Sequence, residues 1–172
     1  GVKPDIMVAG KSIGGGFPVS LIAVSSELGE KIEEGEHGST HGGNPLALAA
    51  LVGGIEAFLS DDVSGRAARM GELLGSQLAE LAQEFKTVVR GVRSKGLMLA
   101  VELRERVSPY IARLQAEGLL LLRSGATTLR MLPPYLISKE DVKFSLKALD
   151  AALHMALTGS QREDIREVLR RA

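Results

Sequence analysis

Lys11 is the first residue of the sequence whose setting suggests chemistry. It follows a short apolar run, Asp5 to Ala9, and precedes a glycine-rich loop. Such a run after a proline predicts a buried strand, and α/β proteins place their sites where strands end. A lysine amine can condense with an aldehyde to form a Schiff base, and partial desolvation favours its neutral form. The same pattern also fits a solvated lysine at a strand end.

Gly10, Lys11 and Ser12 also match the end of the phosphate-binding loop G-x-x-x-x-G-K-[ST]. That loop needs a glycine five positions before Gly10, where this chain has Asp5. The residues between them are apolar and strand-like, whereas a phosphate cradle requires an open loop. These two departures exclude a nucleotide triphosphatase of that type.

Ser39 and Thr40 are candidates for binding an anion. They lie in a glycine-flanked loop that ends at Asn44 and Pro45, two residues typical of a helix start. Hydroxyls and free backbone N–H groups at a helix N-terminus suit a phosphate dianion. A purely structural role, in which Thr40 and Asn44 turn and cap the chain, is equally compatible with this segment.

Arg130 places a charge inside an otherwise apolar strand that two prolines close. The planar guanidinium matches a carboxylate bidentately, so this residue is a candidate for binding a carboxylate substrate. Alternation along the strand also permits a solvent-facing arginine with no ligand.

The elements that must position these residues can be read from the apolar periodicity. The expected strands are 5–9, 21–25, 87–92, 97–103, 119–122 and 128–132. The expected helices are 46–59, a long one from 61 onward, 108–117 and 138–156, followed by an amphipathic tail over 161–171. Gly53 and Gly54 fall inside the first long helix, where we expect them to mark close packing. A domain boundary is expected near residues 60–65.

Composition excludes several classes of function. The 172 residues are 45% hydrophobic and 24% charged with zero formal net charge, which gives no electrostatic case for nucleic acid or membrane binding. The absence of cysteine excludes disulfides and thiol catalysis and fits a reducing cytoplasm. His37 and His41 have a spacing that metal pairs use, but the surrounding glycines oppose a helix, so no metal site is expected.

Four segments together resemble the class III aminotransferases, of the acetylornithine type. The resemblance runs from Gly1 to about residue 155 and does not extend to the tail from Leu157 onward. The first segment resembles the family's cofactor-lysine motif, the second its phosphate loop, and the last two its later signatures. These segments are Pro4 to Pro18, His37 to Ala47, Arg93 to Met98 and Leu129 to Pro134.

The resemblance implies an α/β fold of the fold-type I PLP-transferases. Residues 1–62 would be the C-terminal part of the large domain that binds pyridoxal 5'-phosphate (PLP), and residues 63–172 the small C-terminal α/β domain. It implies a cytoplasmic homodimer whose cofactor site is shared between subunits. It also implies transamination between glutamate or 2-oxoglutarate and an acylated ornithine- or lysine-type ω-amine, in arginine or lysine biosynthesis.

Carried over by position, the resemblance gives each candidate residue a role. Lys11 would bond covalently to PLP and then move a proton during the reaction. Thr40 would bind the phosphate of the cofactor in the partner subunit, and Ser39 would contact substrate there. Arg130 would hold the substrate α-carboxylate.

One departure from the family concerns the segments that precede this sequence in relatives. The aspartate for the pyridine nitrogen, the stacking aromatic and the first phosphate motif of the family are absent from the 172 residues. For the chain as printed we therefore expect no transaminase activity. The alternative is a non-catalytic binding or assembly module that retains half of the aminotransferase fold.

Overall fold

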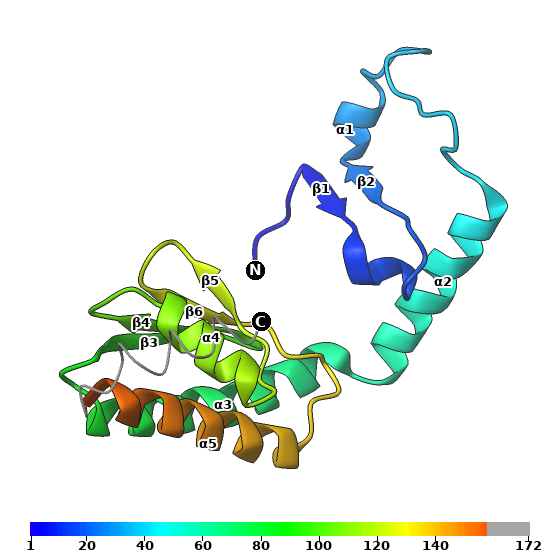
Figure 1. The fold of residues 1–172 in the computed structure, drawn as a ribbon. Helices are drawn as coiled ribbons and strands as arrows, with labels where there is room; N and C mark the ends of the chain where they lie inside the picture. Colours follow the sequence, from blue (N-terminus) through cyan, green and yellow to red (C-terminus); the bar gives the residue numbers. More distant parts are fainter. Residues whose placement is uncertain (158–172) are drawn as a thin grey trace. The chain divides into compact units, whose positions relative to one another are not determined.

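The computed structural model describes residues 1–157 of the 172, and the tail expected over 161–171 lies outside them. The chain divides into two compact units, Gly1–Val63 and a second that begins at Ser64 (Figure 1). No helix among the described residues is long and apolar enough to cross a membrane.

The first unit combines a two-stranded antiparallel sheet with a long helix. Strands β1 and β2 pair with Ile6 opposite Val24, and the short 3-10 helix η1 lies between them in sequence. Helix α2 packs on η1. The elements are β1 (Ile6–Ala9), η1 (Lys11–Gly14), β2 (Leu21–Val24), α1 (Ser26–Gly29) and α2 (Pro45–Ser60).

Strand β1 forms as predicted, but the expectation that it is buried is wrong for the described chain. Ile6, Met7 and Val8 are 58%, 50% and 71% exposed. The reason is that β1 has β2 as its strand partner and the main contact of α2 is with η1, so the apolar side chains of β1 are left exposed within residues 1–157. An apolar run predicts that a strand needs to be buried, but it does not identify the element that buries it.

Helix α2 begins as the sequence predicts and continues through both glycines. The Asn44 side chain accepts a hydrogen bond from Ala47 N at 2.9 Å, and Pro45 occupies the first turn. A β-carbon on Gly54 would lie 2.3 Å from the Ile13 carbonyl oxygen, so the expected close packing is present there. The same expectation is wrong for Gly53, where a β-carbon would meet nothing within 4 Å.

As far as residue 157, the second unit is a four-stranded antiparallel sheet with three helices. Its strand order is β3-β4-β6-β5. Helix α4 contacts both α5 and β5. The elements are α3 (Val63–Glu84), β3 (Val89–Lys95), β4 (Met98–Leu103), α4 (Ser108–Ala116), β5 (Leu122–Ser124), β6 (Thr128–Met131) and α5 (Lys139–Leu157).

The core of this unit lies between one face of the sheet and the helices. Alternate residues of β4 point inward, so that Leu99, Val101 and Leu103 are at most 3% exposed. Helix α3 supplies Leu74 and Leu78 from its apolar stripe. Figure 1 shows α3 and α5 running along the same side of the strands. Among the described residues, the opposite sheet face carries none of these core side chains.

Strand β5 begins later than predicted. The apolar run from Leu119 to Leu122 was expected to be the strand, whereas the strand is Leu122–Ser124. Helix α4 ends at Ala116, Gly118 follows with a φ of +84°, and Leu119 N donates back to Leu114 O at 2.8 Å. The first residues of the run therefore complete the helix end before the strand starts.

Strand β3 is also displaced, to Val89–Lys95 from the predicted 87–92. The Phe85 carbonyl accepts from Val88 N at 2.9 Å and from Val89 N at 2.7 Å, so a turn occupies the predicted start. At the other end the strand extends to a tight turn at Gly96, with φ of +52°. Helix α5 starts as expected, because Ser138 and Asp141 cap it reciprocally.

Candidate functional site

Lys11 stands at the point where the chain leaves β1. It is the first residue of η1, it is exposed, and its φ is +61°. A lysine rarely adopts this left-handed conformation, because the β-carbon crowds the backbone. Its amine forms no hydrogen bond or ion pair that is found among residues 1–157. The residue therefore offers an unengaged amine from a constrained backbone position.

Glycines surround Lys11 and keep the adjacent backbone open. Gly15 and Gly16 have φ of +59° and +105°, and a β-carbon on either would meet nothing within 4 Å. Flat groups can approach backbone of this kind closely. The fixed part of the loop is Ile13, whose carbonyl lies against Gly54 of α2.

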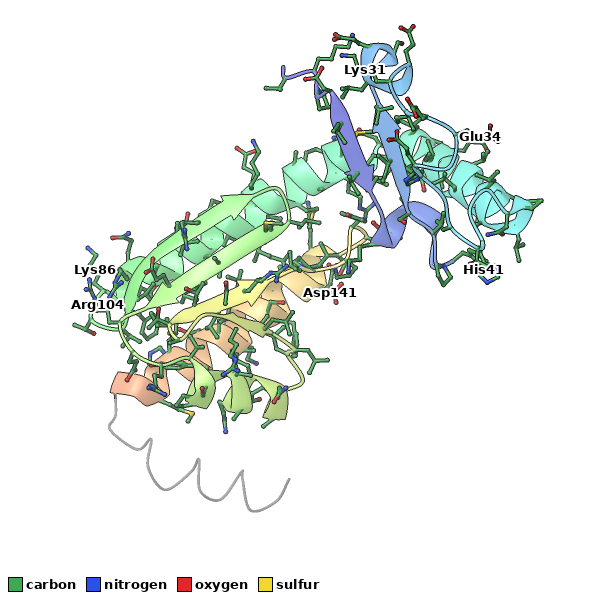
Figure 2. The ribbon with its side chains drawn as sticks, turned by 90° about the horizontal axis from the view of Figure 1, so that it is seen from above. Lys31, Glu34, His41, Lys86, Arg104 and Asp141 are labelled. Atoms are coloured by element: carbon green, nitrogen blue, oxygen red, sulfur yellow. The ribbon has the colours of Figure 1, made fainter. Side chains whose placement is uncertain are left out.

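Ser39 and Thr40 lie in the loop that leads into α2, beside His41, which Figure 2 labels. Gly42 N donates to Ser39 O at 3.1 Å, and a β-carbon on Gly42 would lie 3.0 Å from Ser39 Oγ. The loop is therefore tightly turned around Ser39. Within the described chain, neither the Ser39 nor the Thr40 hydroxyl forms a hydrogen bond, so both are available to a ligand.

Asn44 has the capping role that the sequence indicated. Besides receiving the Ala47 N–H, its side-chain amide donates to His41 O at 3.0 Å. These two bonds join the loop to the first turn of α2. The hydroxyl of Thr40 takes no part in these two bonds. Capping by Asn44 therefore leaves the Thr40 hydroxyl available for anion binding, the other role that the sequence allowed.

Arg130 lies on the sheet face opposite the core. Its neighbours along β6, Leu129 and Met131, are buried at 0% and 3% exposure, whereas Arg130 is exposed. It pairs with Ala100 on β4 and Leu122 on β5. Arg130 also lines a depression of about 370 Å³ on this face. The sequence left open whether Arg130 binds a carboxylate or only faces solvent. In the structure the Arg130 side chain faces away from the core, and it lies in a concave surface.

Two cations of the same depression carried no predicted role. Arg93 and Lys95 from β3 line it together with Arg130. Arg93 was part of a family-like segment, but its face could not be assigned because β3 is displaced from its predicted bounds. Assigning Arg93 to a face of the sheet requires the register between neighbouring strands, and the apolar pattern of one strand does not give that register.

The four candidate residues fall into both units. Lys11, Ser39 and Thr40 belong to the first unit and Arg130 to the second. In the described part of the chain, no hydrogen bond or ion pair joins any two of them. Among the same residues, no group of three or more His, Cys, Asp or Glu side chains is placed to hold a metal ion.

The fold and these residues define a class of protein. The sequence profile of the family "Aminotransferase class-III" matches residues 1–153, so the chain belongs to the class III aminotransferases. The resemblance drawn from the four sequence segments is thereby confirmed. Enzymes of this family depend on PLP and have the fold of type I PLP-transferases, and the expected α/β fold class is confirmed with it.

The chain is similar to several individual members of this family. The chain is 41% identical over 143 residues to a [LysW]-aminoadipate semialdehyde/glutamate semialdehyde transaminase of Sulfurisphaera tokodaii, covering 83% of this chain and 37% of the relative. It is 39% identical to an ornithine aminotransferase of Bacillus cereus, covering 89% and 38%. The structure of acetylornithine aminotransferase from Elizabethkingia anophelis matches with a TM-score of 0.81 at 29% identity, covering 90% and 42%. The chain thus spans about two fifths of the length of these relatives.

The residues present fit PLP. An aldehyde needs an amine that is not already paired, and Lys11 supplies one beside glycine backbone that leaves room for a ring. A phosphate needs donors at a loop or helix start, and the unengaged hydroxyls of Ser39 and Thr40 precede α2.

Proposed function

We propose that this chain serves a PLP-dependent transamination. The amino group would move between glutamate or 2-oxoglutarate and an acylated ornithine- or lysine-type ω-amine, with the semialdehyde as acceptor. The pathway would be arginine or lysine biosynthesis. The names of relatives support this substrate class, since they include a semialdehyde transaminase and ornithine aminotransferases. The observation that carries the proposal is Lys11, which is exposed just after β1 and has no ion pair or hydrogen bond of its amine among residues 1–157.

Lys11 has two tasks in this proposal. PLP, when bound, supplies an aldehyde and a ring that spreads the negative charge developed at the substrate α-carbon. Lys11 Nζ would hold the cofactor through that aldehyde. The same amine, when free, would accept and return a proton at the substrate α-carbon. No ion pair at Nζ is found in the described part of the chain, which supports this role, because a lysine held by a carboxylate is kept charged.

Arg130 orients the substrate. Its guanidinium binds the α-carboxylate of glutamate or 2-oxoglutarate bidentately. The fork geometry fixes the substrate's direction as well as its charge, so the α-hydrogen is held toward one side. An exposed arginine in a depression without acidic lining residues supports this assignment.

The remaining roles concern assembly. Thr40 binds the phosphate of the cofactor held by the partner subunit, Ser39 contacts substrate there, and the enzyme is a cytoplasmic homodimer. The first unit corresponds to the C-terminal part of the large PLP-binding domain, residues 1–62, and the second to the small domain, residues 63–172. The compact division of the chain at Val63 and Ser64 supports those bounds.

The test is covalent trapping of the cofactor. The protein is incubated with PLP, reduced with borohydride and digested, and the peptides are weighed. We expect the pyridoxyl mass on Lys11 and its loss in Lys11→Ala. The matched control is Lys31→Ala, which removes another exposed lysine, one that pairs with Glu27 at 3.0 Å. Labelling of some other lysine, or none at all, would refute the role of Lys11; an absence of labelling would favour a non-catalytic module.

A further inference from the structure

Lys11 has a backbone conformation that a helix end does not explain. Its φ of +61° lies in the left-handed region, which a residue with a β-carbon rarely occupies. Among the described non-glycine residues Asp62 also has a positive φ, but it directly follows the C-cap of α2, where that conformation is common. Lys11 instead opens η1 just after a strand. A strained residue of this kind persists where the surrounding structure holds it, and such residues concentrate at functional sites.

The hydrogen bonds of the loop itself hold Lys11 only weakly. Pairing of β1 with β2 ends at Ala9, before the loop begins. The bond from Ile13 N to Gly10 O, which spans Lys11, is 3.5 Å long and therefore weak. The contact that fixes this turn must come from another element of the unit.

Helix α2 supplies that contact at Gly54. A β-carbon there would lie 2.3 Å from Ile13 O and 3.3 Å from Gly15 N, so the backbone of α2 lies directly against the end of η1. The helix is a firm support, because it extends from Pro45 to Ser60 and its first turn is capped by a side chain. Through η1, this contact also fixes the lysine with which η1 begins.

The same helix is joined to the loop of Ser39 and Thr40. The Asn44 side chain caps α2 and donates to His41 O at 3.0 Å, which connects the loop to the first helical turn. From Asn44 to Gly54 the helix axis rises by about 15 Å. One rigid element therefore contacts both parts of this unit that we assign to the cofactor.

We infer that Gly54 is a positioning residue for Lys11. Because Gly54 has no side chain, α2 packs against the backbone of η1, and this contact sets where the Lys11 amine stands. The inference rests on the proposed function for the role of Lys11. It adds that the helix joined to the loop of Ser39 and Thr40 also holds the amine in place. Gly54 acts through Ile13 and not by touching the cofactor.

The contact distance gives the size of the effect. Nonbonded heavy atoms are in ordinary contact at about 3.5 Å, so Gly54→Ala requires roughly 1 Å more room than the 2.3 Å to Ile13 O. The nearest atoms are all backbone, so η1 or α2 must move. Misplacing a reacting group by about 1 Å can lower a rate about a hundredfold.

The test measures where PLP reacts. Wild type and variants are incubated with PLP, reduced with borohydride and digested, and the ratio of pyridoxyl label on Lys11 to label on Lys31 is determined by mass spectrometry. We expect Gly54→Ala to lower this ratio about tenfold or more. Both lysines belong to the same unit and are compared in one sample, so the ratio does not depend on the amount of protein.

Two further substitutions in α2 separate positioning from stability. Gly53→Ala makes the same chemical change where a β-carbon meets nothing within 4 Å. Ala49→Gly weakens the helix at an exposed position. Both should leave the ratio at its wild-type value. A ratio that Ala49→Gly lowers as much as Gly54→Ala, or that Gly54→Ala leaves unchanged, would overturn the inference.

The comparison is repeated in the Gly53→Ala background. The more stable helix keeps the double variant measurable if Gly54→Ala alone does not fold, and the same loss of ratio is expected. Failure of the proposed function gives a different result, because wild type would then carry no preferential label on Lys11 and both proposals would fall. Preferential labelling of Lys11 that survives Gly54→Ala refutes the positioning role alone.

Discussion

Replacing Gly54 by alanine should loosen the loop that carries Lys11. The new β-carbon would lie 2.3 Å from Ile13 O and 3.3 Å from both Ile13 C and Gly15 N. All three are backbone atoms, so the strain cannot be relieved by turning a side chain. The loop or the helix must move, and η1 begins at Lys11.

The magnitude follows from two opposed terms. Overpacking of this kind costs about 1–3 kcal/mol. Alanine in place of glycine inside a helix returns about 1 kcal/mol. Because the clash is with backbone, we take the upper part of the first range and expect Gly54→Ala to destabilise the unit by about 1–2 kcal/mol.

Gly53 supplies the control within the same helix. A β-carbon there meets nothing within 4 Å, so Gly53→Ala should stabilise α2 by about 1 kcal/mol. The free energy of opening of the α2 amides, measured by hydrogen exchange, should thus separate these adjacent variants by about 2–3 kcal/mol. Equal stabilisation by both alanines would refute the contact between α2 and Ile13.

Two further predictions concern the second unit. Gly71→Ala should destabilise it by about 2 kcal/mol in urea unfolding, because a β-carbon would lie 2.2 Å from Gly96 O; an unchanged midpoint would contradict this packing. Hydrogen bonds from the Ser138 hydroxyl and backbone lower the pKa of Asp141. The unfolded state then binds more protons, so this contribution to stability is present above the ordinary carboxyl pKa of about 3.9 and is lost as the pH falls below it. Asp141→Asn should flatten that part of the stability curve, and a curve unchanged by the substitution would argue against the cap.

Local features of the fold were predictable because short-range chemistry decides them. The Asn44 cap and the Ser138–Asp141 cap each join residues within one helical turn, and both helices begin where the sequence indicated. Strand ends were predicted less well, since hydrogen bonds at the C-terminus of α4 consumed Leu119 before pairing began.

Non-local features could not be predicted in this way. Gly53 and Gly54 are identical in sequence terms, yet only Gly54 meets η1, because the rotation of a helix against its neighbour is a tertiary property. Arg93 and Arg130 lie on either side of Ala100 in the sheet, and this alignment depends on the register of three strands. The exposure of β1 depends on which elements pack against it, and the apolar pattern from Ile6 to Ala9 does not identify those elements.

The backbone of Lys11 carries a consequence for how this position is maintained. Holding a residue with a β-carbon at a φ of +61° costs on the order of 1 kcal/mol, which glycine would avoid. A chain optimised for thermodynamic stability alone would place glycine or asparagine there. A lysine occupies this bend instead, so the chain keeps an amine at a position where the backbone conformation is unfavourable for that residue. Swapping it for glycine should therefore leave a more robust protein, freed of its reactive group.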